Sequence, residues 1–276
     1  MTLAFSKMHG LGNDFVIVDA RTQPLALARQ TIARMGDRHR GVGFDQLLSI
    51  ESASEPGCAF AYRIWNRDGS ESGQCGNGVR CIAAWLARAG ALTPGMVRLQ
   101  GPAGPVEVEI LAGQRVRVDM GAPEFTPAAI PFRTDVASDR YMLTLANATL
   151  EIGAVSMGNP HAVIEVGSLE TAAVADVGAE LEHSAYFPAG CNVEFVQIES
   201  RSRILMRVWE RGAGETQACG SGACAAMAVL RQRQQVDAEV EVVLPGGSLE
   251  ISWQGAGHTL SMTGPAAFVF EGVWHD

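Results

Sequence analysis

The chain contains the same block of residues twice, and this duplication limits the folds that it can adopt. The segment RIWNR at 63–67 is followed, after seven intervening residues, by CGNG at 75–78. The segment RVWER at 207–211 is followed, again after seven intervening residues, by CGSG at 219–222. An apolar run follows both copies, which lie 144 residues apart. Two copies are too few for a solenoid of tandem repeats, so the sequence predicts two related halves.

Further matches occur on either side of this block. Asn13 matches Asn159 and Gln46 matches Asn192, both at a separation of 146 residues. The segment PAGPVEV at 102–108 is echoed by PGGSLEI at 245–251. Because the matching blocks occur in the same order, we interpret the halves as copies of one ancestral unit.

The boundary between the halves is expected near Asp119–Pro131, where Gly121, Pro123, Pro127 and Pro131 cluster. These residue types are typical of turns and linkers. We therefore predict an N-terminal half over residues 1–120 and a C-terminal half over residues 121–265. The last residues, 266–276, follow the second copy and are predicted to return to the first half.

The patterning within each half favours an α+β fold. Alternating or β-branched segments predict strands, namely Cys58–Trp65, Val106–Leu111, Arg115–Met120, Cys191–Gln197, Arg203–Glu210 and Glu239–Leu244. Helical spacing of apolar residues predicts helices at Leu25–Met35, Asn77–Ala89, Leu169–Glu182 and Gly222–Gln234. Strands outnumber helices and do not alternate regularly with them. We therefore expect two pseudo-symmetric domains, each a mostly antiparallel sheet wrapped around a central helix.

Composition excludes several classes of function. The 276 residues carry a net charge of −9, and the basic residues are scattered, so no nucleic-acid partner is expected. Lys7 is the only lysine, which excludes Schiff-base and pyridoxal-phosphate enzymes unless Lys7 itself serves. No apolar stretch reaches the ~18 residues of a membrane span, and the N-terminus lacks a signal-peptide pattern. We expect a cytoplasmic protein with no membrane partner.

Two of the six cysteines occupy matched positions. Cys75 and Cys219 each lie where a glycine-rich loop is predicted to become a helix. The positive end of the helix dipole and the free N–H groups there stabilise a thiolate, and the same N–H groups can hold a carboxylate. No C-x-x-C pair is present, and the loops lack nucleotide-binding signatures. Each half is therefore predicted to supply an acid/base and half of a carboxylate cradle, with no metal.

The duplication gives these cysteines a chemical meaning. If the halves face each other across a cleft, the two thiols lie on opposite sides of one substrate. One thiolate can then remove a proton from a carbon next to a carboxylate, and the other thiol can return one. The helix N-termini would stabilise the developing charge. The sequence thus predicts inversion of a stereocentre without a cofactor, at an active site in the cleft between the halves.

Several polar residues are candidates for the walls of the pocket. Asn13, Gln46, Asn159 and Asn192 recur at matched places in the two halves. The residue after the repeated tryptophan is Asn66 in one half and Glu210 in the other. A carboxylate in only one half can hold a substrate ammonium and bias the neighbouring thiol. Arg67 and Arg211 are candidates for binding a second carboxylate, although an ion pair at the surface is an equally good interpretation of Arg67. His161 could tune a cysteine.

At these residues the sequence resembles the diaminopimelate epimerase family. The matching stretches are MHGLGNDF at 8–15, NRDGSE at 66–71, CGNGVRC at 75–81, MGNPH at 157–161, WERG at 209–212 and ACGSGA at 218–223. The resemblance implies the two-domain epimerase fold, a homodimer, and pyridoxal-independent interconversion of LL- and meso-diaminopimelate. That reaction belongs to lysine and peptidoglycan-precursor biosynthesis.

The resemblance also implies a role for each site residue. Cys75 and Cys219 would be the catalytic pair, and His161 and Glu210 would adjust their pKa values. Substrate would be bound by Asn13, Gln46, Asn66, Gly76, Asn77, Asn159, Asn192, Glu210, Arg211, Gly220 and Ser221. Cys191, where a threonine is expected, is a small departure that places a third thiol near the predicted pocket.

Two other functions stay open. The same fold could racemise another amino acid of the proline or hydroxyproline type, although a monocarboxylic substrate would leave Arg211 and Glu210 unpaired, which is costly in a closed site. Alternatively, Cys75 and Cys219 could form a reversible disulfide in a thiol-redox sensor. We expect such a disulfide to be an inactive by-product, because it would occupy the space that a substrate needs.

Overall fold

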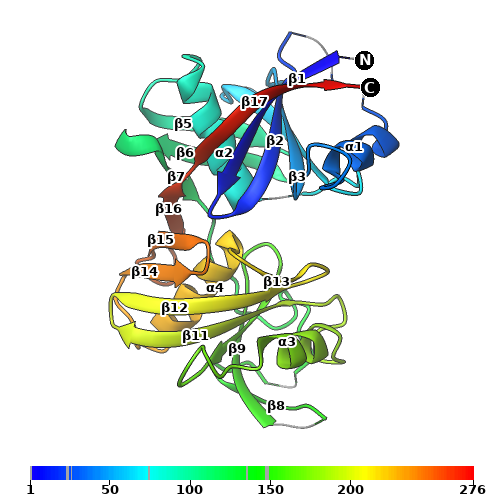
Figure 1. Ribbon diagram of the computed structural model, residues 1–276. Helices are drawn as coiled ribbons and strands as arrows, with labels where there is room; N and C mark the ends of the chain where they lie inside the picture. Colours follow the sequence, from blue (N-terminus) through cyan, green and yellow to red (C-terminus); the bar gives the residue numbers. More distant parts are fainter. Residues whose placement is uncertain (1, 23–24, 26, 74, 135, 147–148) are drawn as a thin grey trace. The chain divides into compact units, whose positions relative to one another are not determined.

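The computed structural model describes residues 2–22, 25, 27–73, 75–134, 136–146 and 149–276. The chain divides into two compact units (Figure 1). Unit 1 comprises Met1–Asp119 and Thr263–Asp276, and unit 2 comprises Met120–Met262. Each unit is a layer of strands packed on a long helix.

Unit 1 is built mainly from antiparallel strand pairs. Its elements are β1 (Thr2–Gly10), β2 (Asn13–Asp19), α1 (Arg29–Gly36), β3 (Gln46–Glu51), β4 (Phe60–Asn66), α2 (Gly76–Arg88), β5 (Gly95–Gly101), β6 (Gly104–Ile110), the short 3-10 helix η1 (Ala112–Gln114), β7 (Arg115–Asp119) and β17 (Ala267–His275). The pairs β2–β3 and β4–β5 are parallel, and the pairs β1–β2, β3–β4, β5–β6, β6–β7 and β1–β17 are antiparallel. Helix α2 contacts β1, β2, β3, β6 and β7.

Unit 2 repeats this scheme. Its elements are β8 (Tyr141–Thr144), β9 (Thr149–Ser156), β10 (Pro160–Glu165), α3 (Val174–Glu182), β11 (Asn192–Ser200), β12 (Arg203–Glu210), β13 (Gly214–Thr216), α4 (Gly220–Gln232), β14 (Glu239–Leu244) and β15 (Gly247–Ser252). The pairs β10–β11 and β12–β14 are parallel, and the pairs β8–β9, β9–β10, β11–β12, β12–β13 and β14–β15 are antiparallel. Helix α4 contacts β9, β10, β11, β14 and β15. Strand β16 (Ser261–Pro265) crosses the division between the units.

The two units share one order of elements, which confirms the predicted duplicated α+β fold. In unit 1 the order β1, β2, α1, β3, β4, α2, β5, β6 corresponds to β9, β10, α3, β11, β12, α4, β14, β15 in unit 2. The parallel pairs occur at the same two places, because a parallel pair needs a long crossover and each crossover here holds a helix. Cys75 and Cys219 therefore precede equivalent helices.

Most predicted elements are found, with two helix starts that were wrong. Strands β12 and β14 have the predicted bounds, and α2 and α4 begin and end within two residues of prediction. Helix α3 begins at Val174, not at Leu169, because Leu169 donates its N–H to Gln197 and accepts from Arg207 instead. Helix α1 begins at Arg29, and Leu25 and Leu27 pack on the core outside the helix.

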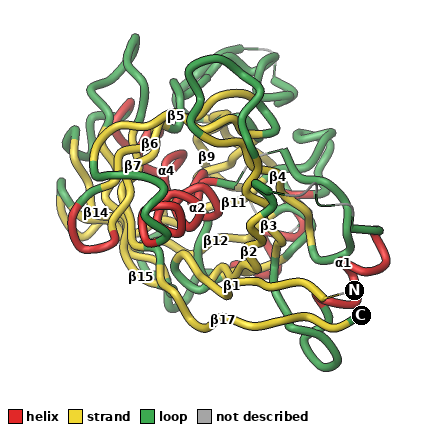
Figure 2. The backbone as a smooth tube through the Cα atoms, turned by 90° about the horizontal axis from the view of Figure 1, so that it is seen from above, coloured by secondary structure: helices red, strands yellow, loops and turns green. Residues whose placement is uncertain are grey.

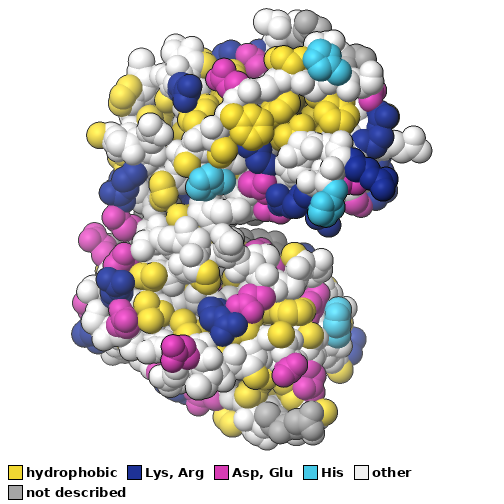
Figure 3. Space-filling model, in the orientation of Figure 1, with side chains coloured by type: hydrophobic (Ala, Val, Ile, Leu, Met, Phe, Trp, Pro, Cys, Tyr) yellow, Lys and Arg dark blue, Asp and Glu magenta, His cyan; other side chains and the backbone are white. Residues whose placement is uncertain are grey.

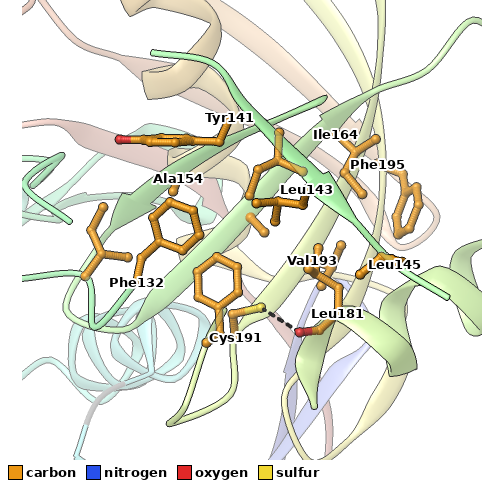
Figure 4. Packing of buried hydrophobic residues seen from close by; sticks show 14 of the residues in the cluster. Phe132, Tyr141, Leu143, Leu145, Ala154, Ile164, Leu181, Cys191, Val193 and Phe195 are labelled. Carbon is orange, nitrogen blue, oxygen red and sulfur yellow. Dashed lines mark hydrogen bonds between the residues drawn. The ribbon is translucent and has the colours of Figure 1, made fainter. Parts of the chain in front are cut away.

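Each unit has its own hydrophobic cluster. In unit 1, buried residues of β1, β2, β3 and α1 pack together, among them Phe5, Val16, Met35 and Leu47. In unit 2, the cluster includes the stacked pair Phe132 and Phe187 and continues to Cys191. Figure 4 shows the Cys191 sulfur directed at the Leu181 carbonyl, 3.9 Å away. This third thiol is thus part of a core.

The two chain ends lie side by side in unit 1 (Figure 2). Thr2 pairs with His275 at one end of the antiparallel ladder between β1 and β17, and His9 pairs with Ala267 at the other. None of the helices in the described part of the chain combines the length and apolar character needed to cross a membrane.

Candidate active site

Cys75 caps the N-terminus of α2. Its backbone is extended, and its sulfur accepts a hydrogen bond from the Gly78 N–H at 3.3 Å. The thiol lies 3.8 Å from Oδ1 of Asn13, to which it can donate. Gly78 leaves room for this turn, because a Cβ there would stand 3.3 Å from Leu48 and 3.5 Å from the Cys75 Cβ. The cysteine is half-buried and lies at the N-terminus of α2, a kind of place where the helix dipole can stabilise an anion.

Asn13 is held so that its carbonyl oxygen faces Cys75. Its amide nitrogen donates to Asp45 at 3.0 Å, and its oxygen accepts from the side chain of Asn77 at 3.3 Å. Asp14, next in the chain, binds both Lys7 and Arg38. Lys7 is therefore buried in an ion pair in unit 1.

The ion pairs set the charge of Asp14. Burial alone would raise its pKa, but the hydrogen bonds from Arg38 and Lys7 outweigh burial and lower the pKa to about 2. Arg38 also donates to Asp45 at 2.8 Å, so the same cation fixes the carboxylate that orients Asn13. The network thus connects four charged groups to one predicted substrate ligand.

Gln46 and Asn66 lie opposite each other on paired strands. Gln46 begins β3, Asn66 ends β4, and the two residues are partners in the antiparallel register. The Gln46 amide donates to the Asn66 oxygen at 3.0 Å, and the Asn66 amide donates to the Ser70 hydroxyl at 3.1 Å. Their placement at strand ends brings two predicted ligands together. Arg67, which follows, is exposed.

Cys219 stands at the N-cap position of α4 in unit 2, in different surroundings from those of Cys75. It is 5% exposed, and its sulfur lies 3.6 Å from the Ser221 hydroxyl. Burial raises the pKa of the Cys219 thiol well above its usual range, and the charges of Glu210 and Glu194 raise it further. The protonated form is therefore favoured at this cysteine.

His161 lies in a buried chain of polar groups. Its Nδ1 is 2.6 Å from Oε1 of Glu194, and its Nε2 is 3.0 Å from Oδ1 of Asn159. His161 and Glu194 are both 0% exposed. Burial raises the pKa of Glu194, while the His161 partner opposes that shift. His161 therefore reaches the predicted ligand Asn159 on one side and a buried carboxylate on the other.

The sequence reasoning missed Glu194. It could have been found by comparing the two halves at their separation of 146 residues. At that separation Glu194 corresponds to Leu48, and His161 corresponds to Phe15. A charged residue at a place where the other copy has a buried leucine marks a difference in chemistry.

Asn192, Glu210 and Arg211 are held around the end of β12. Asn192 accepts the Arg211 backbone N–H at 2.9 Å, and the Arg211 guanidinium donates to the Ala189 carbonyl at 3.0 Å. Glu210 accepts a hydrogen bond from the Thr216 hydroxyl. These three predicted ligands therefore meet in unit 2.

Glu182, the last residue of α3, binds the end of β12 and the turn that follows it. Its two oxygens accept from the Trp209 indole at 2.7 Å and from the Gly212 N–H at 2.8 Å. The anchored residues bracket Glu210 and Arg211, so Glu182 restrains the predicted ligands without being one of them. The sequence reasoning missed this residue also.

The predicted carboxylate cradles are the first residues of the two long helices. Gly76 and Asn77 begin α2, and Gly220 and Ser221 begin α4. Backbone N–H groups in the first turn of a helix have no partner within the helix and attract anions. Unit 1 thus gathers Cys75 with Asn13, Asn77 and, separately, Gln46 with Asn66. Unit 2 gathers Cys219 near Glu194 and Glu210, and His161 with Asn159.

Comparison with known proteins gives these sites a context. A family model described as diaminopimelate epimerase matches residues 5–126 and 153–269. The fold is similar to that of a hydroxyproline epimerase from Agrobacterium vitis with bound trans-4-OH-L-proline, at a TM-score of 0.71 and 15% identity, covering 99% of this chain and 92% of that one. It is also similar to a Bacillus anthracis phenazine biosynthesis protein of the PhzF family, at a TM-score of 0.71 and 17% identity over 100% of both chains.

A third structure of the same fold is a methylitaconate-delta-isomerase, at a TM-score of 0.68 and 14% identity, covering 99% of this chain and 95% of that one. At such identities the structural likeness establishes the fold, whereas the family model covers most of the chain, including both cysteine-capped helices. The chain belongs to the diaminopimelate epimerase family.

Proposed function

We propose that this protein is a cofactor-independent epimerase that converts LL-diaminopimelate to meso-diaminopimelate with Cys75 and Cys219 as its two acid/base groups. The observation that carries the proposal is the matched placement of these cysteines, each at the N-terminus of the equivalent helix of its unit. Family membership supports the class of reaction.

The proposed reaction moves one proton in each of two steps. A thiolate removes the α-proton, and the electron pair of the broken C–H bond delocalises into the substrate carboxylate. The other cysteine, as a thiol, then donates its proton to the opposite face of the carbon. Afterwards the two sulfurs have exchanged protonation states. Helix N-terminal N–H groups stabilise the charge that develops on the carboxylate.

The features of unit 2 favour a substrate with a second amino-carboxylate end. Arg211 offers a guanidinium for a second carboxylate, and Glu210 and Asn192 offer acceptors for an ammonium. A substrate with one carboxylate would offer the Arg211 guanidinium no distal carboxylate to bind. Racemisation of a proline-type amino acid is the second candidate, because a hydroxyproline epimerase shares the fold.

A direct assay separates these candidates. Purified protein is incubated with LL-diaminopimelate, L-proline and trans-4-hydroxy-L-proline in parallel, and the stereoisomers are resolved by chiral chromatography. We expect meso-diaminopimelate to form and both imino acids to stay unchanged. Racemised proline with no reaction of diaminopimelate would reverse the choice. Epimerisation by the oxidised protein, with none after reduction, would instead favour the hypothesis of a thiol-redox sensor.

We also propose that the enzyme acts in the cytoplasm as a homodimer, in biosynthesis of lysine and of peptidoglycan precursors. Strand β17 supports an association surface, because Val269, Phe270 and Val273 are each about half exposed. Hydrophobic side chains gather on the face of unit 1 shown in Figure 3. Exposed apolar patches of this kind often mark protein interfaces. Sedimentation velocity tests the homodimer, and we expect the protein in solution to have twice the mass of one chain.

A further inference from the structure

The two cysteine-capped helices rest on different side chains at one matched position. In unit 1, a Cβ on Gly78 would stand 3.3 Å from Leu48. In unit 2, a Cβ on the matching Gly222 would stand 2.7 Å from Oε1 of Glu194 and 3.2 Å from the Cys219 Cβ. A carboxylate therefore lies against the first turn of α4, next to Cys219, where unit 1 has an apolar side chain.

The partner of that side chain differs in the same way. His161 matches Phe15, and all four residues are fully buried. The strands have the same register, since Phe15 pairs with Gln46 and His161 pairs with the matching Asn192. The fold thus accepts an apolar Phe–Leu pair here, and unit 2 carries a buried His–Glu pair instead.

A buried polar pair of this kind is weak evidence for a role in stability. Removing two ionisable groups from water is costly, and well-packed apolar residues in their place are often neutral or stabilising. Glu194 also has an oxygen, Oε2, that is buried and has no hydrogen-bond partner among the described residues. Such orphaned atoms are rare in folded proteins and call for a functional explanation.

The pair acts on two predicted site residues. His161 holds the Asn159 carbonyl oxygen at its Nε2, so the Asn159 amide nitrogen is left to donate elsewhere. Glu194 lies against Gly222 in the first turn of α4, which also adjoins Cys219. The charges of Glu194 and Glu210 both act on the Cys219 thiol, whose sulfur lies 3.6 Å from the Ser221 hydroxyl. In unit 1, by contrast, the Asn13 carbonyl faces the Cys75 sulfur directly.

We propose that Glu194 is a positioning residue that, through His161 and through its contact with the first turn of α4, makes Cys219 the cysteine that holds its proton in the resting enzyme. The role of Glu194 in catalysis rests on the proposed function, since a two-base epimerase needs one thiol and one thiolate. Glu194 itself does not touch the substrate.

The test measures the two thiols independently of any substrate. Cys75 and Cys219 are alkylated with iodoacetamide between pH 6 and 9.5, and the rate at each is read by peptide mass spectrometry. Glu194→Gln keeps the size of the side chain and removes its charge. We expect Cys219 to react at least about threefold faster at pH 7.5, the change for half a pKa unit. The rate at Cys75 should change less than twofold.

A matched control and a second variant keep the result interpretable. Glu199→Gln makes the same chemical change at an exposed place on β11 and should leave both rates unchanged. The double variant His161→Phe/Glu194→Leu copies the pair of unit 1, so it stays informative if Glu194→Gln does not fold. We expect it to melt at the same or a higher temperature, to accelerate Cys219 alkylation, and to lose at least tenfold in kcat/KM.

An unchanged Cys219 rate in folded Glu194→Gln, or full activity in the double variant, would overturn the role of Glu194. If the wild-type enzyme does not epimerise diaminopimelate, the proposed function fails, but the alkylation comparison still decides how Cys219 is controlled.

Discussion

Nδ1 of His161 lies 2.6 Å from Oε1 of Glu194, and neither side chain has any exposure to solvent. Unit 1 has Phe15 and Leu48 at the matching places. The two halves of this duplicated chain therefore keep one backbone scheme but give their cysteines different neighbours. In the proposed two-base reaction the two acid/base groups start in opposite protonation states, and different neighbours would favour one of the two assignments.

Loss of either cysteine should abolish inversion. Cys75→Ala and Cys219→Ala each remove a proton carrier, and we expect kcat to fall by about 10³-fold or more, within the range of general acid–base catalysis. Circular dichroism of the substrate measures the rate. Cys191→Ala is the control, since this thiol lies in a hydrophobic cluster and should be dispensable for activity. Turnover that survives either of the first two substitutions is incompatible with a two-base mechanism.

Gly222 should not tolerate a side chain. In Gly222→Ala the new Cβ would stand 2.7 Å from Oε1 of Glu194, whose displacement breaks its contact with His161. We expect a loss of about 1–3 kcal/mol in the free energy of unfolding, measured by urea denaturation. Gly167→Ala is the matched control, because nothing lies within 4 Å of its Cβ. Equal stability of the two variants would contradict the close packing at Gly222.

Asp14 should make stability depend on pH in the acid range. Its pKa is about 2 in the folded protein, below the ordinary value of 3.8. The folded state therefore gains from the ionised carboxylate above about pH 4, and this gain is lost as the pH falls from 3.8 towards 2. Asp14→Asn should unfold with about 2 kcal/mol less free energy at pH 7.

Urea denaturation across pH 2–7 checks this prediction. The difference between wild type and Asp14→Asn should shrink below pH 4 and nearly vanish at pH 2. Asp237→Asn, which breaks an exposed ion pair with Arg201, should cost less than about 1 kcal/mol at any pH. A difference for Asp14→Asn that is constant with pH would show that the carboxylate is not selectively stabilised in the folded state.

Arg211 should contribute to substrate choice. Arg211→Met removes a charged donor, and loss of such a hydrogen bond costs about 1.5–3 kcal/mol. We expect kcat/KM for LL-diaminopimelate to fall about 100-fold, mainly through KM. The control, Arg201→Met, changes an arginine that is paired with Asp237 and should stay within twofold. Unchanged kinetics in Arg211→Met would argue for a substrate without a distal carboxylate.

Much of the fold could be predicted from the sequence. The duplication is visible when the two halves are compared, and the periodicity of β12, β14, α2 and α4 is a local signal. The starts of α1 and α3 could not be predicted, since tertiary hydrogen bonds such as that from Arg207 to Leu169 compete with helical spacing. Strand β17 has exposed apolar residues on both faces and lacks alternation, so only its pairing with β1 identifies it.

Part of the candidate site could also be predicted from the duplication. The cysteines and the amides were predicted because they occupy matched positions in the two halves. Glu194 was missed because the search followed likeness between the halves, and its signal is a difference from Leu48. Glu182 was missed because its role comes from contacts with Trp209 and Gly212 that no sequence spacing reveals.

The origin of the proton in the product tests the two-base mechanism most directly. LL-diaminopimelate is incubated with the enzyme in D2O, and both isomers are analysed by mass spectrometry at low conversion. We expect one deuterium in each meso product, because the donating thiol carries solvent deuterium, and none in the remaining LL substrate. Deuterium entering substrate and product at equal rates would instead show that a single base serves both faces.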